Sequence, residues 1–167
     1  MALGTIVSSI NGNIRNIGNK PIPKPIIETI TTPTSRANTW QYARYNNVVD
    51  LSNVKRIVFK YVLYSYFREY SDKYGDYYAS ANLKCGISPT NSGGFTNHAD
   101  RNNVWYGEKY VNHGTTFSTS GQLTLDVSTL KGKYYVGIGA QYDMGVHQQS
   151  DTGYTWASLT SVEFYKE

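Results

Sequence analysis

The stretch Val54–Arg68, VKRIVFKYVLYSYFR, decides the fold of this 167-residue chain. Its side chains alternate in character from one residue to the next. Ile57 and Phe59 share one face with other apolar residues, whereas Tyr64 and Tyr66 share the opposite face with lysine and valine. A period of two residues belongs to a β-strand and does not fit an α-helix. We therefore predict a long strand with one buried face and one amphipathic face that carries tyrosines.

Similar alternation recurs through the rest of the chain. Further strands are predicted at Ala79–Ile87, Lys133–Gln141 and Thr155–Tyr165. A hairpin tip is predicted at Tyr70–Tyr78, polar loops at Ser88–Asn103 and Asp143–Tyr154, and a turn at Asp126–Leu130. Charged residues are only 17%, which excludes a long charged helix, and 16 tyrosines favour strands. The predicted fold class is all-β: an antiparallel two-sheet β-sandwich of jelly-roll type, preceded by an extended N-terminal arm.

Composition divides the chain near residue 35. Residues 1–35 contain no Tyr, Trp or Phe, and they place isoleucines among Asn, Gly and Pro. We predict an N-terminal arm at residues 1–35 and a β-sandwich domain at residues 36–167. A solvated linker gains nothing from exposed isoleucines, so we expect the arm to dock on a partner, folding on contact. The alternatives are a disordered tail and an N-terminal strand packed on its own domain. The expected docking residues are Ile6, Ile10, Ile14, Ile17, Ile22 and Ile26.

Charge and targeting signals narrow the possible partners. The net charge is +4, and residues 1–60 hold eight of the 16 Lys and Arg but two of the 12 Asp and Glu. This excess suits an acidic partner surface. Nucleic acid is not an expected partner, because the basic residues form no run of five and are separated by Ile, Pro and Asn. No apolar stretch approaches the length of a membrane span, and the first residues lack the pattern of a secretory signal.

The sequence offers no coherent catalytic constellation. Asp151-Thr152-Gly153 matches the aspartic-protease tripeptide, but such a site needs a second carboxylate, and a turn explains the tripeptide better. The single cysteine, Cys85, lies in an apolar alternation and is predicted to be a core residue. The three histidines show no zinc-ligand spacing. A calcium site of loop oxygens stays open, but we predict no catalytic residue, metal ligand or cofactor.

Tyrosine clusters at the predicted loops instead suggest binding. Tyrosine with Ser, Gly and Asn is typical of adaptable recognition surfaces, because rigid rings supply area and small polar groups supply hydrogen bonds. Sugars suit such a surface. The alternative is that these rings simply cover the faces of the sheets. The candidate ligand-binding residues are Tyr74, Tyr77, Asn97, Asp100, Trp105 and Tyr106.

Two segments resemble a known framework. They are Val49–Phe59, with its Asp-Leu-Ser, and Leu123–Ile138, which reads LTLDVSTLKGKYYVGI and is followed later by the aromatic Ser161–Tyr165. Together they are similar to β-sandwich domains that recur in virion proteins of tailed bacteriophages from Gram-positive hosts, and in related carbohydrate-binding modules. The resemblance implies a jelly-roll fold and a virion or adhesion setting. Its motif residues look structural, so it carries over no binding residue.

These observations lead to a functional expectation. We expect a non-enzymatic bacteriophage structural protein of the virion, made in the cytoplasm of a bacterial host. It would be a capsid decoration or head fibre, or a tail or baseplate accessory. Its partners would be other virion proteins through the arm, host-surface glycans, and further copies of itself. The alternatives are a free-standing carbohydrate-binding module or lectin and, third, a glycan-active enzyme.

Overall fold

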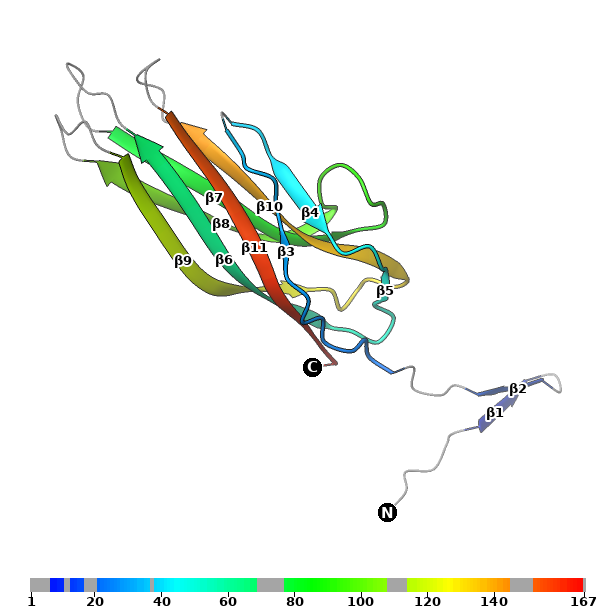
Figure 1. The fold of residues 1–167 in the computed structure, drawn as a ribbon. Helices are drawn as coiled ribbons and strands as arrows, with labels where there is room; N and C mark the ends of the chain where they lie inside the picture. The colour runs from blue at the N-terminus through cyan, green and yellow to red at the C-terminus, as the bar shows by residue number, and fades with distance from the viewer. Residues whose placement is uncertain are drawn as a thin grey trace.

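The computed structural model describes residues 7–10, 13–16, 21–36, 38–68, 77–107, 114–144 and 152–166. Most of these residues lie in strands, and none of them belongs to a helix long and apolar enough to cross a membrane (Figure 1). The strands are β1 (Val7–Ile10), β2 (Asn13–Asn16), β3 (Ile30–Thr31), β4 (Gln41–Arg44), β5 (Val49–Asp50), β6 (Arg56–Arg68), β7 (Tyr77–Ser88), β8 (Asn97–Gly107), β9 (Gly114–Asp126), β10 (Lys133–Met144) and β11 (Thr152–Tyr165).

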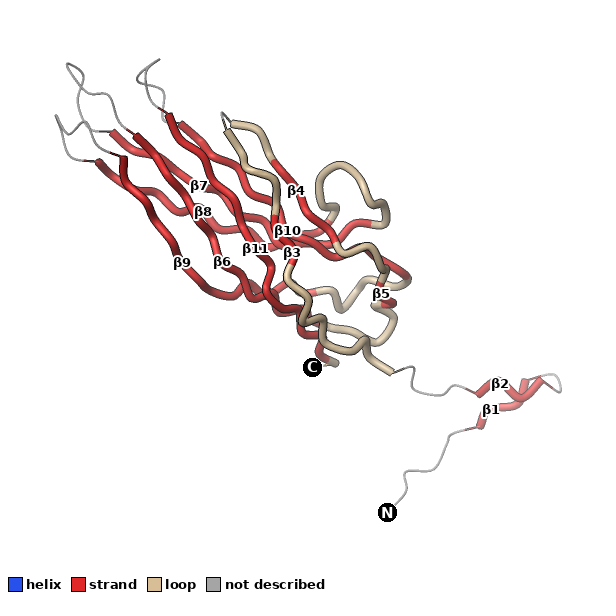
Figure 2. Tube along the Cα trace, viewed as in Figure 1, coloured by secondary structure: helices blue, strands red, loops and turns tan. Residues whose placement is uncertain are grey.

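Two antiparallel sheets make a sandwich, and in Figure 2 the strands of one sheet lie in front of those of the other. One sheet has the order β3-β11-β6-β9, and the other has the order β4-β10-β7-β8, with β5 also paired to β10. Four antiparallel pairs lie one within the next along the chain: β3–β11, β4–β10, β6–β9 and β7–β8. The first and third pairs join through β11–β6 to make one sheet, and the second and fourth join through β10–β7 to make the other. A long hairpin rolled up in this way is a jelly roll. The predicted fold class is confirmed.

The core fills the space between the sheets. The central strand β6 contributes the fully buried side chains Ile57, Phe59, Tyr61 and Leu63. Cys85 lies among the inward residues of β7, as its alternation predicts. The remaining buried hydrophobic residues of the core cluster are Tyr45, Leu51, Val54, Ala81, Leu83, Ile87, Val127, Val136, Ile138, Ala140, Ala157, Leu159, Val162 and Phe164.

The structure departs from the predicted loop at Ser88–Asn103. Asn97–Asn103 is instead the first part of β8, which pairs with β7 along its length. The polar side chains of this segment are tolerated because β8 is an edge strand. The turn at Asp126–Leu130 is confirmed: the Asp126 carboxylate accepts a hydrogen bond from the Ser128 amide at 2.8 Å. Gly132 follows with φ of 100°, a conformation that favours glycine.

Residues 21–35 pack on this chain's own sandwich. Ile22, Ile26 and Ile30 are half-buried against the core cluster. Ile26 exchanges two backbone hydrogen bonds with Val162, at 2.9 and 2.8 Å. Ser35 likewise pairs with Thr155. The second half of the predicted arm therefore adds an edge to the β11 sheet, which was the alternative of an N-terminal strand packed on its own domain.

Tyr45 fastens this segment to the core. It is 5% exposed, and its hydroxyl donates to the Glu28 carbonyl at 2.6 Å. Burial, followed by the nearby charges of Glu28 and Cys85, raises the pKa of Tyr45 from 10.0 to about 12. The stability that depends on the neutral hydroxyl is thus present below pH 10 and is lost as the pH rises towards about 12.

We predict that Tyr45→Phe lowers the free energy of unfolding by about 1 kcal/mol at pH 8, because the Glu28 carbonyl loses its donor. The difference from wild type should shrink between pH 10 and 12, where only the wild type carries this titrating group. Urea unfolding at several pH values measures both effects. The control Tyr135→Phe, on a half-buried ring, should stay within about 0.5 kcal/mol of wild type at pH 8. A Tyr45→Phe difference that is constant from pH 8 to 12 would contradict the role of the hydroxyl.

Candidate functional site

The six residues predicted to bind ligand do not form one cluster. Tyr74 lies outside the described residues. Tyr77 begins β7, next to the end of β8 that carries Trp105 and Tyr106, and the side chains of these three are outside the described set. Asn97 pairs with Ile87 at the opposite end of β8, about 26 Å from Trp105 along the strand. The structure therefore separates the other five residues into two groups, with Tyr77, Trp105 and Tyr106 at one end of the β7–β8 pair and Asn97 and Asp100 towards the other.

Asn97 and Asp100 also occupy different faces of β8. Asn97 is opposite the buried Ile87, so it belongs to the face that looks towards the core. Asp100 is opposite the half-buried Lys84 and is exposed on the outer face. A single ligand on one face of this sheet cannot contact both residues.

The rings that the structure does bring together lie on the outer face of the other sheet. Tyr64 and Tyr66 come from β6, and Tyr154 and Trp156 come from β11. In the register, Tyr66 is opposite Tyr154 and Tyr64 is opposite Trp156. All four side chains are half-buried, while the residues between them point into the sandwich. We call these four residues the aromatic strip.

Neighbouring rings of the aromatic strip are stacked with an offset. The ring centres of Trp156 and Tyr64 are 5.1 Å apart, those of Tyr64 and Tyr154 are 6.2 Å apart, and those of Tyr154 and Tyr66 are 5.2 Å apart. The planes differ by 14° to 28°. Stacked carbon atoms approach to about 3.5 Å, so each ring is displaced by about 4–5 Å from its neighbour. Neighbouring rings therefore overlap only in part.

Polar groups flank the strip on both sides. The Arg36 guanidinium lies 5.1 Å from the ring centre of Tyr154. Burial raises the pKa of the Tyr154 hydroxyl, as does a hydrogen bond with Tyr64, so this hydroxyl stays neutral and can donate at ordinary pH. On the other side, β9 presents a row of exposed, uncharged hydroxyl and amide side chains. They are Thr116, Ser118, Ser120, Gln122 and Thr124.

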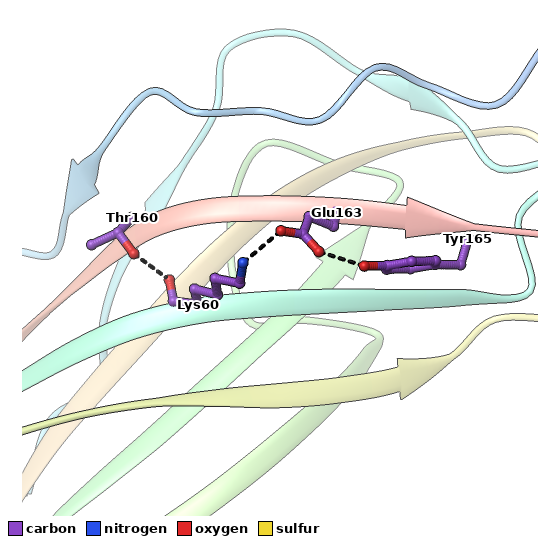
Figure 3. Close-up of polar contacts among 4 residues, drawn as sticks. All are labelled: Lys60, Thr160, Glu163 and Tyr165. Atoms are coloured by element: carbon purple, nitrogen blue, oxygen red, sulfur yellow. Dashed lines mark hydrogen bonds and ion pairs between the residues drawn. The ribbon is translucent and has the colours of Figure 1, made fainter.

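A β-bulge in β11 changes which residues of this strand face outward and which face the core. The register shifts between Leu159 and Ser161, so one extra residue, Thr160, is inserted. Its hydroxyl donates to the Lys60 carbonyl at 3.0 Å, as Figure 3 shows. Before the bulge the even-numbered residues face outward, and after it the odd-numbered residues do so.

A charged group occupies the outer face beyond the bulge. Lys60 Nζ and a Glu163 carboxylate oxygen are 2.6 Å apart, and the Tyr165 hydroxyl donates to the other oxygen (Figure 3). Arg56 lies over the Tyr165 ring at 4.1 Å. Hydrogen bonds from Lys60 and Tyr165 lower the pKa of Glu163, so this carboxylate is ionised at neutral pH. Its partners neutralise it, and the group has the character of a surface ion pair.

The outer face of the second sheet carries a smaller ring cluster. Tyr42 is stacked on Trp40 at 6.0 Å and contacts Phe95 edge-on at 5.3 Å. Lys84 lies 4.4 Å from the Trp40 ring centre, and Arg44 lies 4.7 Å from that of Phe95. These two cations cover faces of the Trp40 and Phe95 rings, as Arg36 does for Tyr154 in the aromatic strip. The cluster holds three rings, one fewer than the aromatic strip.

The described residues also include side chains of the types that ligate metals, and the single cysteine. No set of three or more His, Cys, Asp and Glu side chains within these residues is arranged to hold a metal ion. Cys85 is completely buried in the core, and burial raises the pKa of its thiol. A thiol in this state is a poor nucleophile.

We predict that Cys85 in the folded protein resists alkylation by iodoacetamide at pH 8, because reagents react with the thiolate and need access. The same thiol should be modified completely in 6 M guanidinium chloride, a concentration of about the order needed to unfold small domains. Mass spectrometry measures the modified fraction. Rapid alkylation of the native protein would contradict the buried position.

Comparisons with known proteins assign no family. No family model matches this chain, and no curated protein matches it. The solved structures that resemble it include one described as "Structure of infectious bursal disease virus Gx strain", with 11% sequence identity and a TM-score of 0.26. The alignment covers 89% of this chain and 39% of that chain. A TM-score of this size carries no inference about fold or function.

Proposed function

We propose that this chain is a non-enzymatic structural protein of a bacteriophage virion whose jelly-roll domain adheres to host-surface glycans. The observation that carries the adhesive part is the aromatic strip beside the uncharged row on β9. The virion part rests on the resemblance of the Asp-Leu-Ser and Leu-Asp-Val-Ser segments. A free-standing carbohydrate-binding module or lectin would use the same surface, and it is the second candidate.

The chemistry of sugars fits the aromatic strip. A sugar ring has an apolar C–H face that lies on aromatic rings, and hydroxyls around its edge that need hydrogen-bond partners. The half-buried rings of Tyr64 and Trp156 offer an aromatic surface for the C–H face. Ser118 and Gln122 on β9 offer hydrogen-bond partners for the hydroxyls. The neutral, rigid rings lose little conformational entropy on binding. An elongated strip also suits a polymer, since several sugar units can lie along it.

Attachment to a particle would raise the strength of such binding. A surface open to solvent forms few contacts per sugar unit, so a single copy is expected to bind weakly. Many copies on one particle convert weak contacts into high avidity. We infer that the domain is displayed in many copies and that residues before position 21 attach it, since residues 21–35 are used within the sandwich.

We predict that Trp156→Ala weakens glycan binding about tenfold to a hundredfold, because a central aromatic contact in a binding surface commonly contributes about 1.4–2.8 kcal/mol. The matched control is Trp40→Ala, since Trp40 is also a half-buried, stacked tryptophan but lies on the opposite face of the molecule. Glycan arrays followed by titration with the best ligand measure the effect. Equal losses in both variants, or no binding by wild type at high density, would overturn the adhesive role.

A separate experiment tests the virion setting. Mass spectrometry of purified particles should detect the chain in many copies. Deletion of residues 1–20 should abolish incorporation while circular dichroism shows an intact sandwich, because Ile22 and Ile26 are retained. A folded deletion variant that still enters particles would contradict attachment by this segment. Complete absence of the wild-type chain from particles would favour the free-standing lectin.

A further inference from the structure

A hexapeptide pattern occurs twice in the chain and forms the same turn each time. Asp50–Lys55 reads DLSNVK, and Asp126–Lys131 reads DVSTLK. In each copy the aspartate carboxylate accepts a hydrogen bond from the serine amide two residues later, at 2.9 and 2.8 Å. In each copy a further backbone bond closes the turn, at 3.0 and 2.9 Å. The second residue of each copy, Leu51 or Val127, is fully buried in the core.

The two turns interlock at one end of the sandwich. The amide of Leu51, in the first copy, donates to the carbonyl of Gly132 just after the second copy, at 2.8 Å. The amide of Val127, in the second copy, donates to the carbonyl of Lys55 at 2.8 Å. This reciprocal pairing brings the ends of both hexapeptides together, although they are 76 positions apart in the chain.

The paired turns line an open pocket of about 230 Å³. Each copy contributes its serine and its final lysine: Ser52 and Lys55 from one, Ser128 and Lys131 from the other. A third lysine, Lys166, completes the rim. It reaches this place because the Lys55 amide donates to the Tyr165 carbonyl at 2.8 Å, which fixes the end of β11 beside the first turn.

The charge of the pocket is one-sided. No Asp or Glu is among the described residues that line it, whereas three lysines are. Each of the two aspartates accepts a hydrogen bond from the serine amide of its own turn, and Asp50 also accepts one from the Ser52 hydroxyl. Lys131 also donates to the Ser52 carbonyl at 2.9 Å, which holds its ammonium at the junction of the two turns. The turn accounts for the aspartate and the buried apolar residue of each copy, because the first accepts its hydrogen bond and the second packs in the core. It does not account for the lysine at the same position in both copies.

From this geometry we propose that the pocket binds a phosphate group carried by a host-surface glycan. Lysine ammoniums are compact point charges with several donors, and they are common phosphate-binding groups in proteins. The described lining of the pocket has three lysines and no acid. A phosphate oxyanion therefore suits the charge of the pocket.

The phosphate site is distinct from the aromatic strip. Lys55 precedes Tyr64 by nine residues, which is about 30 Å along an extended strand. A small phosphate can therefore occupy the pocket alone, whereas a polymer can reach both places. The glycan carrier rests on the proposed function; the phosphate group itself does not.

The test uses the full chain and three probes: inorganic phosphate, a poly(glycerol phosphate) polymer and single-stranded DNA. The double substitution Lys55→Gln/Lys166→Gln should weaken binding of the first two probes about tenfold or more, because each removes a charge-assisted contact. Binding of the polymer should also fall as salt is raised. Lys131 is left in place because it supports the junction of the turns. Lys133→Gln is the matched control, since Lys133 is exposed nearby but outside the pocket. Titration calorimetry gives the affinities, and urea unfolding reports folding.

The outcomes separate the phosphate site from the adhesive strip. Wild-type binding of phosphate that Lys55→Gln/Lys166→Gln weakens and Trp156→Ala leaves unchanged supports the pocket, even if no neutral glycan binds. Equal affinities of the double variant and wild type for phosphate overturn it, as does an equal loss in Lys133→Gln. Preference for DNA over the glycerol phosphate polymer, lost in the double variant, overturns the glycan carrier. If a neutral glycan binds and only Trp156→Ala abolishes that binding, the proposed function is supported even when the phosphate site is contradicted.

Discussion

The two-residue period of β6 is the constraint on which the rest of the structure depends. This strand lies between β11 and β9, so its inward residues have neighbours on both sides and must be apolar and well packed. Phe59 and Leu63 meet this requirement and are almost completely buried. A shift of one residue in its pairing would exchange the faces and put Tyr64 and Lys60 into the core. Burial of one face of β6 thus sets the register, and the register in turn decides which side chains lie on the outer face.

The aromatic strip follows from that register. Once β6 is fixed, Tyr64 and Tyr66 must lie outside, and antiparallel pairing puts Trp156 and Tyr154 opposite them. Cross-strand aromatic pairs also stabilise a sheet, so the strip can support the fold and still present free ring surface. The bulge at Thr160 has a complementary effect. It lets β11 keep Val162 and Phe164 inward on one side of the shift and Trp156 outward on the other.

The sequence was sufficient for much of the fold because the decisive signal is local. Alternation in Arg56–Arg68 and Lys133–Gln141 marks strands that are buried on one face, and the Asp126 turn depends on residues two positions apart. Asn97–Asn103 escaped prediction because an edge strand can be polar on both faces, which removes the alternation. The packing of Ile22 and Ile26 also escaped, since it depends on the uncovered edge of β11, more than 120 residues away.

The candidate sites were harder to predict than the fold for a related reason. Tyr64 and Trp156 are 92 positions apart, and only the β6–β11 register brings them together. Nearness to the predicted loops therefore favoured Trp105 and Asn97, whose places on β8 are far apart. The pocket between Lys55 and Lys131 has the same origin, because reciprocal bonds between two distant turns create it. Both surfaces rest on backbone that the core already holds rigid. Their outward side chains can therefore change without loss of the fold.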